Sequence, residues 1–137
     1  MESISFRAWD KEEKKMHKVK TIEFSRRGAR IIHLAEVQSN GKGDHKRWHS
    51  SVELMQSTGL KDKNGTEIYE GDIVKYNTVP NSSLSDNYFK IIQARSGEWR
   101  IDNYIEGHEL AFCNHQVEVV GNIFENKELL EDKVNGH

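Results

Sequence analysis

The fold of this chain is decided at residues 57–76, which read S-T-G-L-K-D-K-N-G-T-E-I-Y-E-G-D-I-V-K-Y. Asn64 and Gly65 form a strong tight-turn pair, because both residue types tolerate a positive φ. Gly71 and Asp72 belong to a second turn, which is followed by an apolar run typical of a strand. The two turns leave only a very short strand between them. We therefore interpret these four residues as structural turn residues in a small, tightly curved β-barrel.

The same stretch also offers an alternative, because three carboxylates lie near the two glycines. Asp62, Glu70 and Asp72 could hold Ca²⁺ or Mg²⁺ through their oxygens. However, the spacing lacks the D-x-D-x-D-G run and the closing glutamate of an EF-hand loop. We therefore expect turns rather than a metal site.

Short alternations of apolar and polar residues continue along the rest of the chain and predict further strands. Val, Thr, Ile and Phe, which favour strands, are frequent in them. We expect strands at 3–9, 48–56, 66–69, 73–76, 108–113 and 116–124, and hairpins over 16–35 and 88–105. For residues 48–56 a short helical turn is the alternative. Residues 38–47 are expected to form a polar loop, and residues 125–132 one or two helical turns.

These elements predict a mainly β protein with a barrel-like fold. We place a β-hairpin-based N-terminal part at residues 1–56. Residues 57–137 are expected to form an SH3-like barrel with a short C-terminal helix. The alternative is that the two parts pack together as one domain.

The charge of the chain is divided unevenly along its length. The net charge is only −2, but residues 1–50 hold 12 Lys and Arg against 7 Asp and Glu, whereas residues 51–137 hold 8 against 15. Such asymmetry can steer a charged partner or favour self-association. With 35% hydrophobic and 31% charged residues, we also expect a small hydrophobic core and a large polar surface exposed to solvent.

The composition indicates a cytoplasmic protein. Cys113 is the single cysteine, so no intramolecular disulfide can form, as is usual in a reducing compartment. No apolar run approaches the ~18 residues of a membrane helix. Residues 1–7 lack the basic start and the apolar stretch of a signal peptide. We expect location in the cytoplasm of a host bacterium and no contact with a membrane.

Two basic segments, 25–30 and 42–48, are candidates for contact with nucleic acid. We interpret both as loops. An indole next to basic side chains can stack on a base while the cations contact phosphate. The candidate residues are Arg26, Arg27, Arg30, Lys42, Lys46, Arg47 and Trp48. Against this reading, the net charge is negative and no known nucleic-acid-binding motif is present.

Histidine and cysteine spacings give weaker signals. His45 and His49 are four residues apart and, with Cys113 and His115, could make a four-ligand zinc site. Cys113 and His115 could also be a nucleophile and its base. Neither spacing is a strong signature, and the sequence offers no orienting acid or oxyanion hole. We expect no metal, no cofactor and no catalytic residues.

Three blocks of the chain resemble the YopX family of phage and prophage proteins. They read F-R-A-W-D-K-E-E-K-K-M (6–16), L-M-Q-S-T-G-L-K-D-K-N-G-T-E-I-Y-E-G-D-I-V-K-Y (54–76) and V-E-V-V-G-N-I-F-E-N-K-E-L-L (117–130). The resemblance implies a small β-rich protein encoded by a temperate phage or a prophage. The family has no assigned enzymatic activity and no agreed catalytic residues, so the resemblance carries no catalytic residue onto this chain. The E-G-D-I-V stretch (70–74) is also similar to the opening strand of SH3-like barrels.

These observations favour a non-enzymatic accessory protein that binds a host or phage protein. The alternative is a nucleic-acid-binding module that uses the basic segments 25–30 and 42–48. Exposed edges of short strands also make a homo-oligomer a reasonable expectation.

Overall fold

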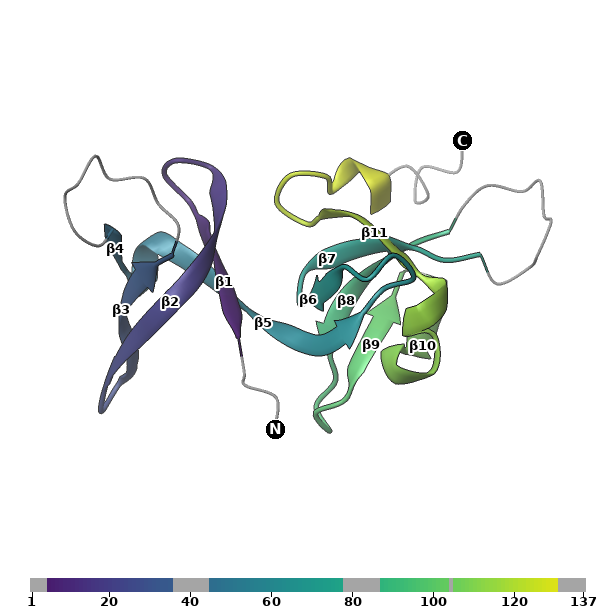
Figure 1. Cartoon of the computed structure of the whole chain (residues 1–137), viewed down its shortest axis with the longest axis horizontal. Helices are drawn as coiled ribbons and strands as arrows, with labels where there is room; N and C mark the ends of the chain where they lie inside the picture. Colours follow the sequence, from purple (N-terminus) through teal and green to yellow (C-terminus); the bar gives the residue numbers. More distant parts are fainter. Residues whose placement is uncertain (1–4, 36–44, 78–86, 104, 131–137) are drawn as a thin grey trace. The chain divides into compact units, whose positions relative to one another are not determined.

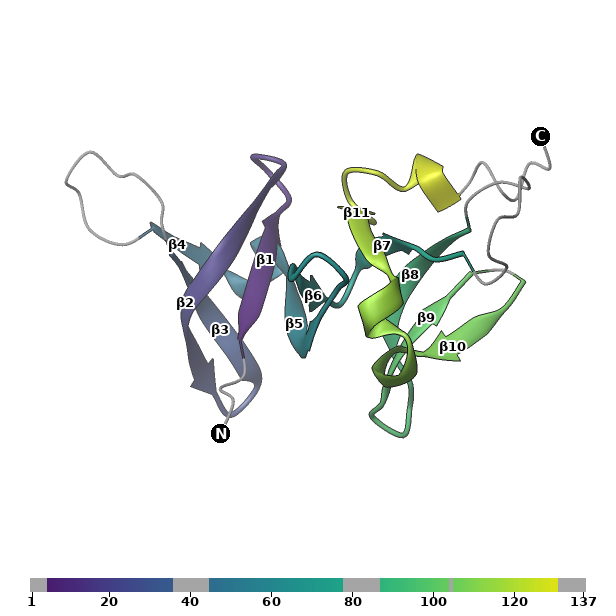
Figure 2. The same ribbon diagram turned by 45° about the vertical axis from the view of Figure 1, so that its right-hand side comes forward.

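The chain forms two compact units, Met1–Gln56 (unit 1) and Ser57–His137 (unit 2), in a computed structural model (Figures 1 and 2). The residues that the structure describes are 5–35, 45–77, 87–103 and 105–130. The boundary predicted from the sequence also follows Gln56, and whether the two parts pack as one domain stays a prediction. The prediction of a mainly β protein is confirmed, because both units are built on antiparallel sheets.

Unit 1 is more than a hairpin, because five strand segments join in one sheet in the order β4-β3-β2-β1-β5. The predicted hairpin over 16–35 is confirmed as β2 and β3, and β1 lies on its other side. The elements are β1 (Phe6–Asp10), β2 (Lys15–Ser25), β3 (Gly28–Leu34), β4 (His45–Trp48), the 3₁₀ turn η1 (His49–Ser51) and the first half of β5 (Val52–Lys61).

Unit 2 begins where the second half of β5 pairs with the short strand β6 (Glu67–Tyr69). A five-stranded sheet follows in the order β10-β9-β8-β7-β11. Its elements are β7 (Asp72–Lys75), β8 (Tyr88–Gln93), β9 (Trp99–Asp102), β10 (Gly107–Glu109), the 3₁₀ turns η2 (Leu110–Phe112) and η3 (Asn114–Gln116), and β11 (Glu118–Asn122). The predicted short C-terminal helix is present as a helical turn at residues 128–130.

Both units share one connectivity. Four antiparallel strands follow one another, a 3₁₀ turn comes next, and a fifth strand returns to pair with the first. In the part of the chain that the structure describes, neither sheet closes into a barrel, and β10 and β11 are the two edges of the second sheet. The predicted barrel is therefore corrected to open sheets. The edge strands β10 and β11 do not pair with each other, so this sheet stays open, and β6 pairs with β5 instead of joining it.

Two further strand predictions are corrected. Residues 45–47, expected in a polar loop, belong to β4 because they pair with β3. Their charge does not prevent this, since the guanidinium of Arg47 has carboxylate partners. The strand expected at 108–113 ends at Glu109, where the chain turns into η2.

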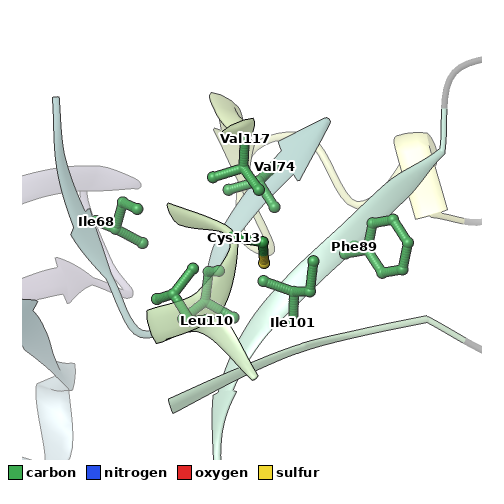
Figure 3. Packing of buried hydrophobic residues seen from close by; sticks show 8 residues of the cluster. Ile68, Val74, Phe89, Ile101, Leu110, Cys113 and Val117 are labelled. Atoms are coloured by element: carbon green, nitrogen blue, oxygen red, sulfur yellow. The ribbon is translucent and has the colours of Figure 1, made fainter. Parts of the chain in front are cut away.

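The core of unit 2 lies between its sheet and the 3₁₀ turns (Figure 3). Alternation along β8 produces one face of this core, because Phe89 and Ile91 are buried while Lys90 is exposed. The fully or almost fully buried members are Ile68, Val74, Phe89, Ile91, Ile101, Leu110, Cys113 and Val117. The matching cluster in unit 1 is smaller and consists of Ala8, Ile32, Leu34 and Val52. Unit 1 therefore depends more on polar contacts.

Large aromatic residues in a polar chain this short usually fill the core, so the sequence predicts buried positions for Trp9, Phe24, Tyr76 and Trp99. Trp9 is buried, and Tyr76 and Trp99 pack against the core of unit 2. Phe24 is 71% exposed, and that expectation is wrong. It lies opposite Ala29, one pair before the β2–β3 turn, at the margin of the core of unit 1. No helix in the described ranges is long and apolar enough to cross the lipid bilayer.

One buried carboxylate fixes the turn that contains Asn64 and Gly65. Asp62 accepts hydrogen bonds from the backbone N–H groups of Asn64 (2.8 Å), Thr66 (2.9 Å) and, from β11, Val119 (2.9 Å). Gly65 occupies the left-handed position of this turn with φ +85°. Gly71 has the same φ in the next turn, where Asp72 accepts from the N–H of Tyr69.

Replacing this carboxylate should weaken unit 2. We expect Asp62→Ala to lower the free energy of unfolding by about 3 kcal/mol, because three backbone donors lose a charged acceptor. Denaturant unfolding followed by the fluorescence of Trp99 measures this. The exposed neighbour provides a matched control, since Lys63→Ala should change stability by less than about 0.5 kcal/mol. Equal stability of the two variants would contradict the assigned role of Asp62.

Candidate functional site

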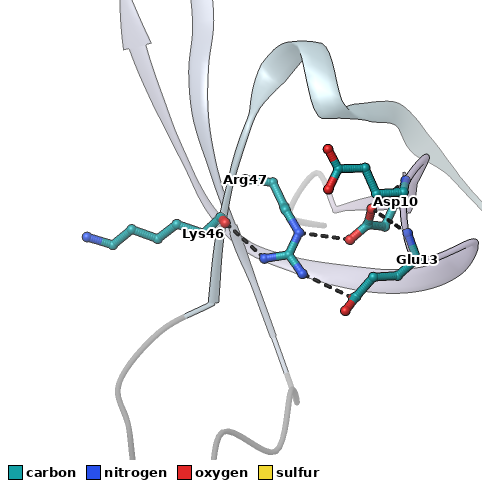
Figure 4. A network of polar contacts seen from close by, with 5 residues as sticks. Asp10, Glu13, Lys46 and Arg47 are labelled. Atoms are coloured by element: carbon teal, nitrogen blue, oxygen red, sulfur yellow. Dashed lines mark hydrogen bonds and ion pairs between the residues drawn. The ribbon is translucent and has the colours of Figure 1, made fainter.

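A buried ion pair ties the edge strand β4 to the β1–β2 turn (Figure 4). The side chain of Asp10 is 1% exposed, and its Oδ2 accepts from Nε of Arg47 at 2.8 Å. Its Oδ1 accepts from the backbone N–H groups of Glu12 and Glu13. Nη2 of Arg47 also reaches Oε1 of Glu13 at 3.1 Å, so this guanidinium is neutralised inside the protein.

The same network sets the protonation of Asp10. Burial alone would raise the pKa of this carboxyl. The hydrogen bond from Arg47, the two backbone N–H groups and the charge of Arg47 outweigh burial and hold the pKa below its ordinary value of 3.8. The carboxylate form is therefore the form that the fold requires.

Asp10, Glu13 and His17 could in principle hold a metal, since their ligand atoms lie within 4.8 Å of one another. Nε2 of His17 is buried and has no hydrogen-bond partner among the described residues. However, both oxygens of Asp10 already accept hydrogen bonds, and Arg47 places a positive charge on the two carboxylates. A cation would have to displace that guanidinium. The geometry therefore favours the ion pair.

The outward side of strands β2, β3 and β4 forms a separate surface, here named the Trp48 face. Directly opposite residues of antiparallel strands point to the same side, so the pairing register gives two rows across the three strands. The first row holds Glu23, Ile31 and Trp48, and the second holds Thr21, His33 and Lys46. The opposite side carries Ile32 and Leu34 into the core.

Two β-bulges place basic residues beside these rows. The register skips Lys20 between Val19 and Thr21, and it skips Arg30 between the pairs of Glu23 and Phe24. A bulge re-aims the extra side chain. Accordingly, Cζ of Arg30 lies 5.9 Å from the ring centroid of Trp48, within cation–π range. Trp48 is still 56% exposed. With Ile31, Lys46 and Arg47 it lines an open depression of about 180 Å³.

The structure separates the predicted nucleic-acid residues into three groups. Arg26 and Arg27 are exposed in the β2–β3 turn, and Arg30, Lys46 and Trp48 lie on or beside the Trp48 face. Arg47 points to the core side and is neutralised. Lys42 lies outside the described residues. The two segments interpreted as basic loops are largely strand, because residues 28–30 belong to β3 and residues 45–48 to β4.

Sequence reasoning missed the contribution of β2 to this surface. Lys18 and Lys20 are exposed on β2, and His33 of β3 lies against Glu23. The H-K-V-K-T-I-E-F stretch (17–24) gave only part of the signal, because alternation places Lys18 and Lys20 opposite Val19 but on the same side as Ile22. The bulge at Lys20 carries no such signal, because it depends on the pairing with β3.

Unit 2 displays two large apolar side chains of its own. Phe112 is 83% exposed and Ile105 is 76% exposed. Phe112 is carried by η2, which is anchored by the fully buried Leu110. The segment of Ile105 is held by Asn103, whose Oδ1 accepts from the N–H groups of Ile105 and Glu106. Both side chains are therefore presented by fixed backbone.

The cysteine and histidine candidates do not come together as a reactive pair. Cys113 is 5% exposed and packs in the core of unit 2, while His115 is exposed. Burial raises the pKa of the Cys113 thiol, which disfavours the nucleophilic thiolate. Among the possible zinc ligands, His49 is exposed, and the side chain of His45 lies outside the described residues.

Comparison with known proteins gives the family. The model of the YopX protein family matches residues 5–131. The chain belongs to the YopX family. The resemblance drawn from three sequence blocks is thereby confirmed. A similar solved structure is that of protein EF1440 from Enterococcus faecalis, with 30% identity and a TM-score of 0.66, covering 95% of this chain and 99% of that one.

A shorter similarity links this YopX chain to discoidin-2 from Dictyostelium discoideum. The two are 32% identical over 66 residues, which is 48% of this chain and 25% of discoidin-2. The aligned region thus spans about a quarter of that relative.

Acid stability should depend on Asp10. Because its pKa is lower in the folded chain than the ordinary value of 3.8, its stabilisation is present above pH ~4 and is lost as the pH falls through the folded pKa. We expect Asp10→Asn to lower the free energy of unfolding at pH 7 by about 2 kcal/mol and to flatten the decline below pH 3.8. Urea unfolding at pH 7 and pH 3 measures both effects.

The control for this experiment is Glu12→Gln, which changes an exposed carboxylate in the same turn and keeps the backbone N–H that Asp10 binds. It should behave as wild type at both pH values. If Asp10→Asn lost as much stability as wild type between pH 7 and pH 3, Asp10 would not be the titrating group.

Proposed function

We propose that this YopX protein is a non-enzymatic accessory protein of a phage or prophage and that it acts by binding another protein. The observation that carries the proposal is the exposure of Phe112 on a rigid 3₁₀ turn. Exposed aromatic side chains on fixed backbone are typical anchors of protein interfaces, because little conformational entropy is lost when they are buried.

The surroundings of Phe112 support the role of an anchor. Leu110 and Cys113 pack in the core on either side of it, and the N–H of Cys113 donates to the carbonyl of Leu110 at 2.9 Å. The backbone therefore cannot easily rotate the phenyl ring inward. Ile105 adds a second exposed apolar group in the same unit.

We also propose that unit 2 has an SH3-like fold that is left open. The support is its connectivity, in which β7 to β10 follow one another, 3₁₀ turns come next and β11 returns to β7. The E-G-D-I-V stretch (70–74) leads into the first strand of this sheet. SH3-like folds host many functions, so this proposal concerns architecture and does not identify the partner.

Capture of a partner by the tagged full-length chain tests the binding function. A lysogen that carries the gene supplies the cell extract, and quantitative mass spectrometry compares wild type with Phe112→Ser. We expect at least one protein that wild type enriches and the variant does not. With that protein purified, Phe112→Ser should raise Kd by about 10- to 100-fold, because burying a phenyl group contributes about 1.5–3 kcal/mol.

Phe24→Ser is the matched control, since it removes an exposed phenyl group from unit 1. It should capture the same protein as wild type. The proposal fails if wild type enriches nothing above an untagged background, or if Phe112→Ser captures the partner as well as wild type does.

A further inference from the structure

We propose that the Trp48 face of unit 1 is a second binding surface and that its ligand is a single-stranded nucleic acid. One base would stack on the indole of Trp48, and the phosphates on either side would contact the surrounding cations. This surface differs from the Phe112 anchor in location and in chemistry, so the two proposals can succeed or fail separately.

The charge of the three strands is complementary to a polyanion. Their one carboxylate is that of Glu23, which lies against His33. Apart from Arg47, whose charge is compensated by Asp10 and Glu13, the basic residues on or beside this face of the strands are Lys18, Lys20, Arg30 and Lys46. The exposed Arg26 and Arg27 extend this positive region into the β2–β3 turn.

Trp48 provides the element that a purely electrostatic patch lacks. Its side chain is 56% exposed although the indole is large and apolar, and Ile31 lies directly opposite it on β3. The guanidinium of Arg30, 5.9 Å from the ring centroid, orients the indole at the edge of the depression. Stacking of a base on an aromatic ring contributes to the binding of single strands without sequence preference.

The shape of the surface favours a single strand over a duplex. In the described part of unit 1 the face is an open sheet surface with one exposed indole, and no helix is available to enter a major groove. In a duplex the bases are stacked on one another and are closed to Trp48, whereas the bases of a single strand are open. An acidic polypeptide is the competing occupant, and it would use the cations without the indole.

Fluorescence anisotropy of a fluorescein-labelled 15-nucleotide oligothymidylate tests the proposal with the full chain. We expect saturable binding that weakens about 30-fold between 50 and 200 mM salt, the value for three to four phosphate contacts on a single strand. The same sequence as a duplex with oligoadenylate should bind more weakly at 50 mM salt. Failure to bind the single strand at 50 mM salt would overturn the proposal.

Two kinds of substitution separate stacking from charge. Trp48→Ala should raise Kd by about tenfold and leave the salt dependence unchanged, whereas Trp48→Phe should keep most of the affinity. The double substitution Lys20→Glu with Lys46→Glu should raise Kd more than tenfold and reduce the salt dependence. Thermal unfolding checks that each variant remains folded, which is expected because all three side chains are exposed.

The controls come from unit 2. Lys90→Glu changes an exposed strand lysine, and Phe112→Ala removes an exposed aromatic ring. Both should bind the oligonucleotide as wild type does, although Phe112→Ala should lose the captured protein. If Trp48→Ala and the double variant also bind as wild type does, the Trp48 face is not the site.

Competition with poly-glutamate tests whether the Trp48 face binds an acidic polypeptide as well as it binds a single-stranded nucleic acid. At equal charge concentration, poly-glutamate should displace less than half of the bound oligonucleotide from the wild-type chain. Displacement as complete as that by unlabelled oligothymidylate would mean that the face recognises negative charge alone, and the assignment to nucleic acid would be wrong.

Discussion

Both units are organised around a buried aspartate that holds its own turn and one distant strand. Asp10 accepts two backbone N–H groups of the β1–β2 turn and the guanidinium of Arg47 on β4. Asp62 accepts two N–H groups of the β5–β6 turn and the N–H of Val119 on β11. In each case the last contact spans many residues of sequence, 37 for Asp10 and 57 for Asp62. A buried carboxylate is stable only when its oxygens accept hydrogen bonds, so each aspartate holds its donors in place. In a chain with a small apolar core, these contacts help to position the strands.

The contact of Asp10 also explains how the surface of unit 1 is built. Arg47 is drawn to the core side of β4, and alternation along a strand then turns Lys46 and Trp48 outward. The same ion pair removes one cation from the surface while it fixes the indole beside it. In this way an interaction that stabilises the fold determines which basic residues remain available to a ligand. Unit 2, which has the larger core, instead uses Leu110 and Cys113 to hold Phe112 outward.

Much of the architecture could be predicted from the sequence, because the signals involved are local. Alternation and Gly-containing turns located the β2–β3 and β8–β9 hairpins, and the three sequence blocks located the family. The strand at His45–Trp48 was missed because its charged residues resemble a loop unless the distant partner of Arg47 is known. The open form of the five-stranded sheet reflects the absence of pairing between its edge strands β10 and β11, and local alternation and turn signals do not reveal whether two such edges pair. The candidate surface was found only in part, since Trp48 and Arg30 were visible in the sequence but the bulges that aim Lys20 and Arg30 were not.

Amide hydrogen exchange of the wild-type chain at neutral pH tests most directly whether the buried aspartates hold these turns. The account predicts that the N–H groups of Asn64, Thr66 and Val119, together with those of Glu12 and Glu13, exchange as slowly as amides inside the sheets. The N–H of Arg27, which donates to the exposed hydroxyl of Ser25 in a turn without a buried carboxylate, should exchange much faster. Equal, rapid exchange at all of these positions would contradict the account.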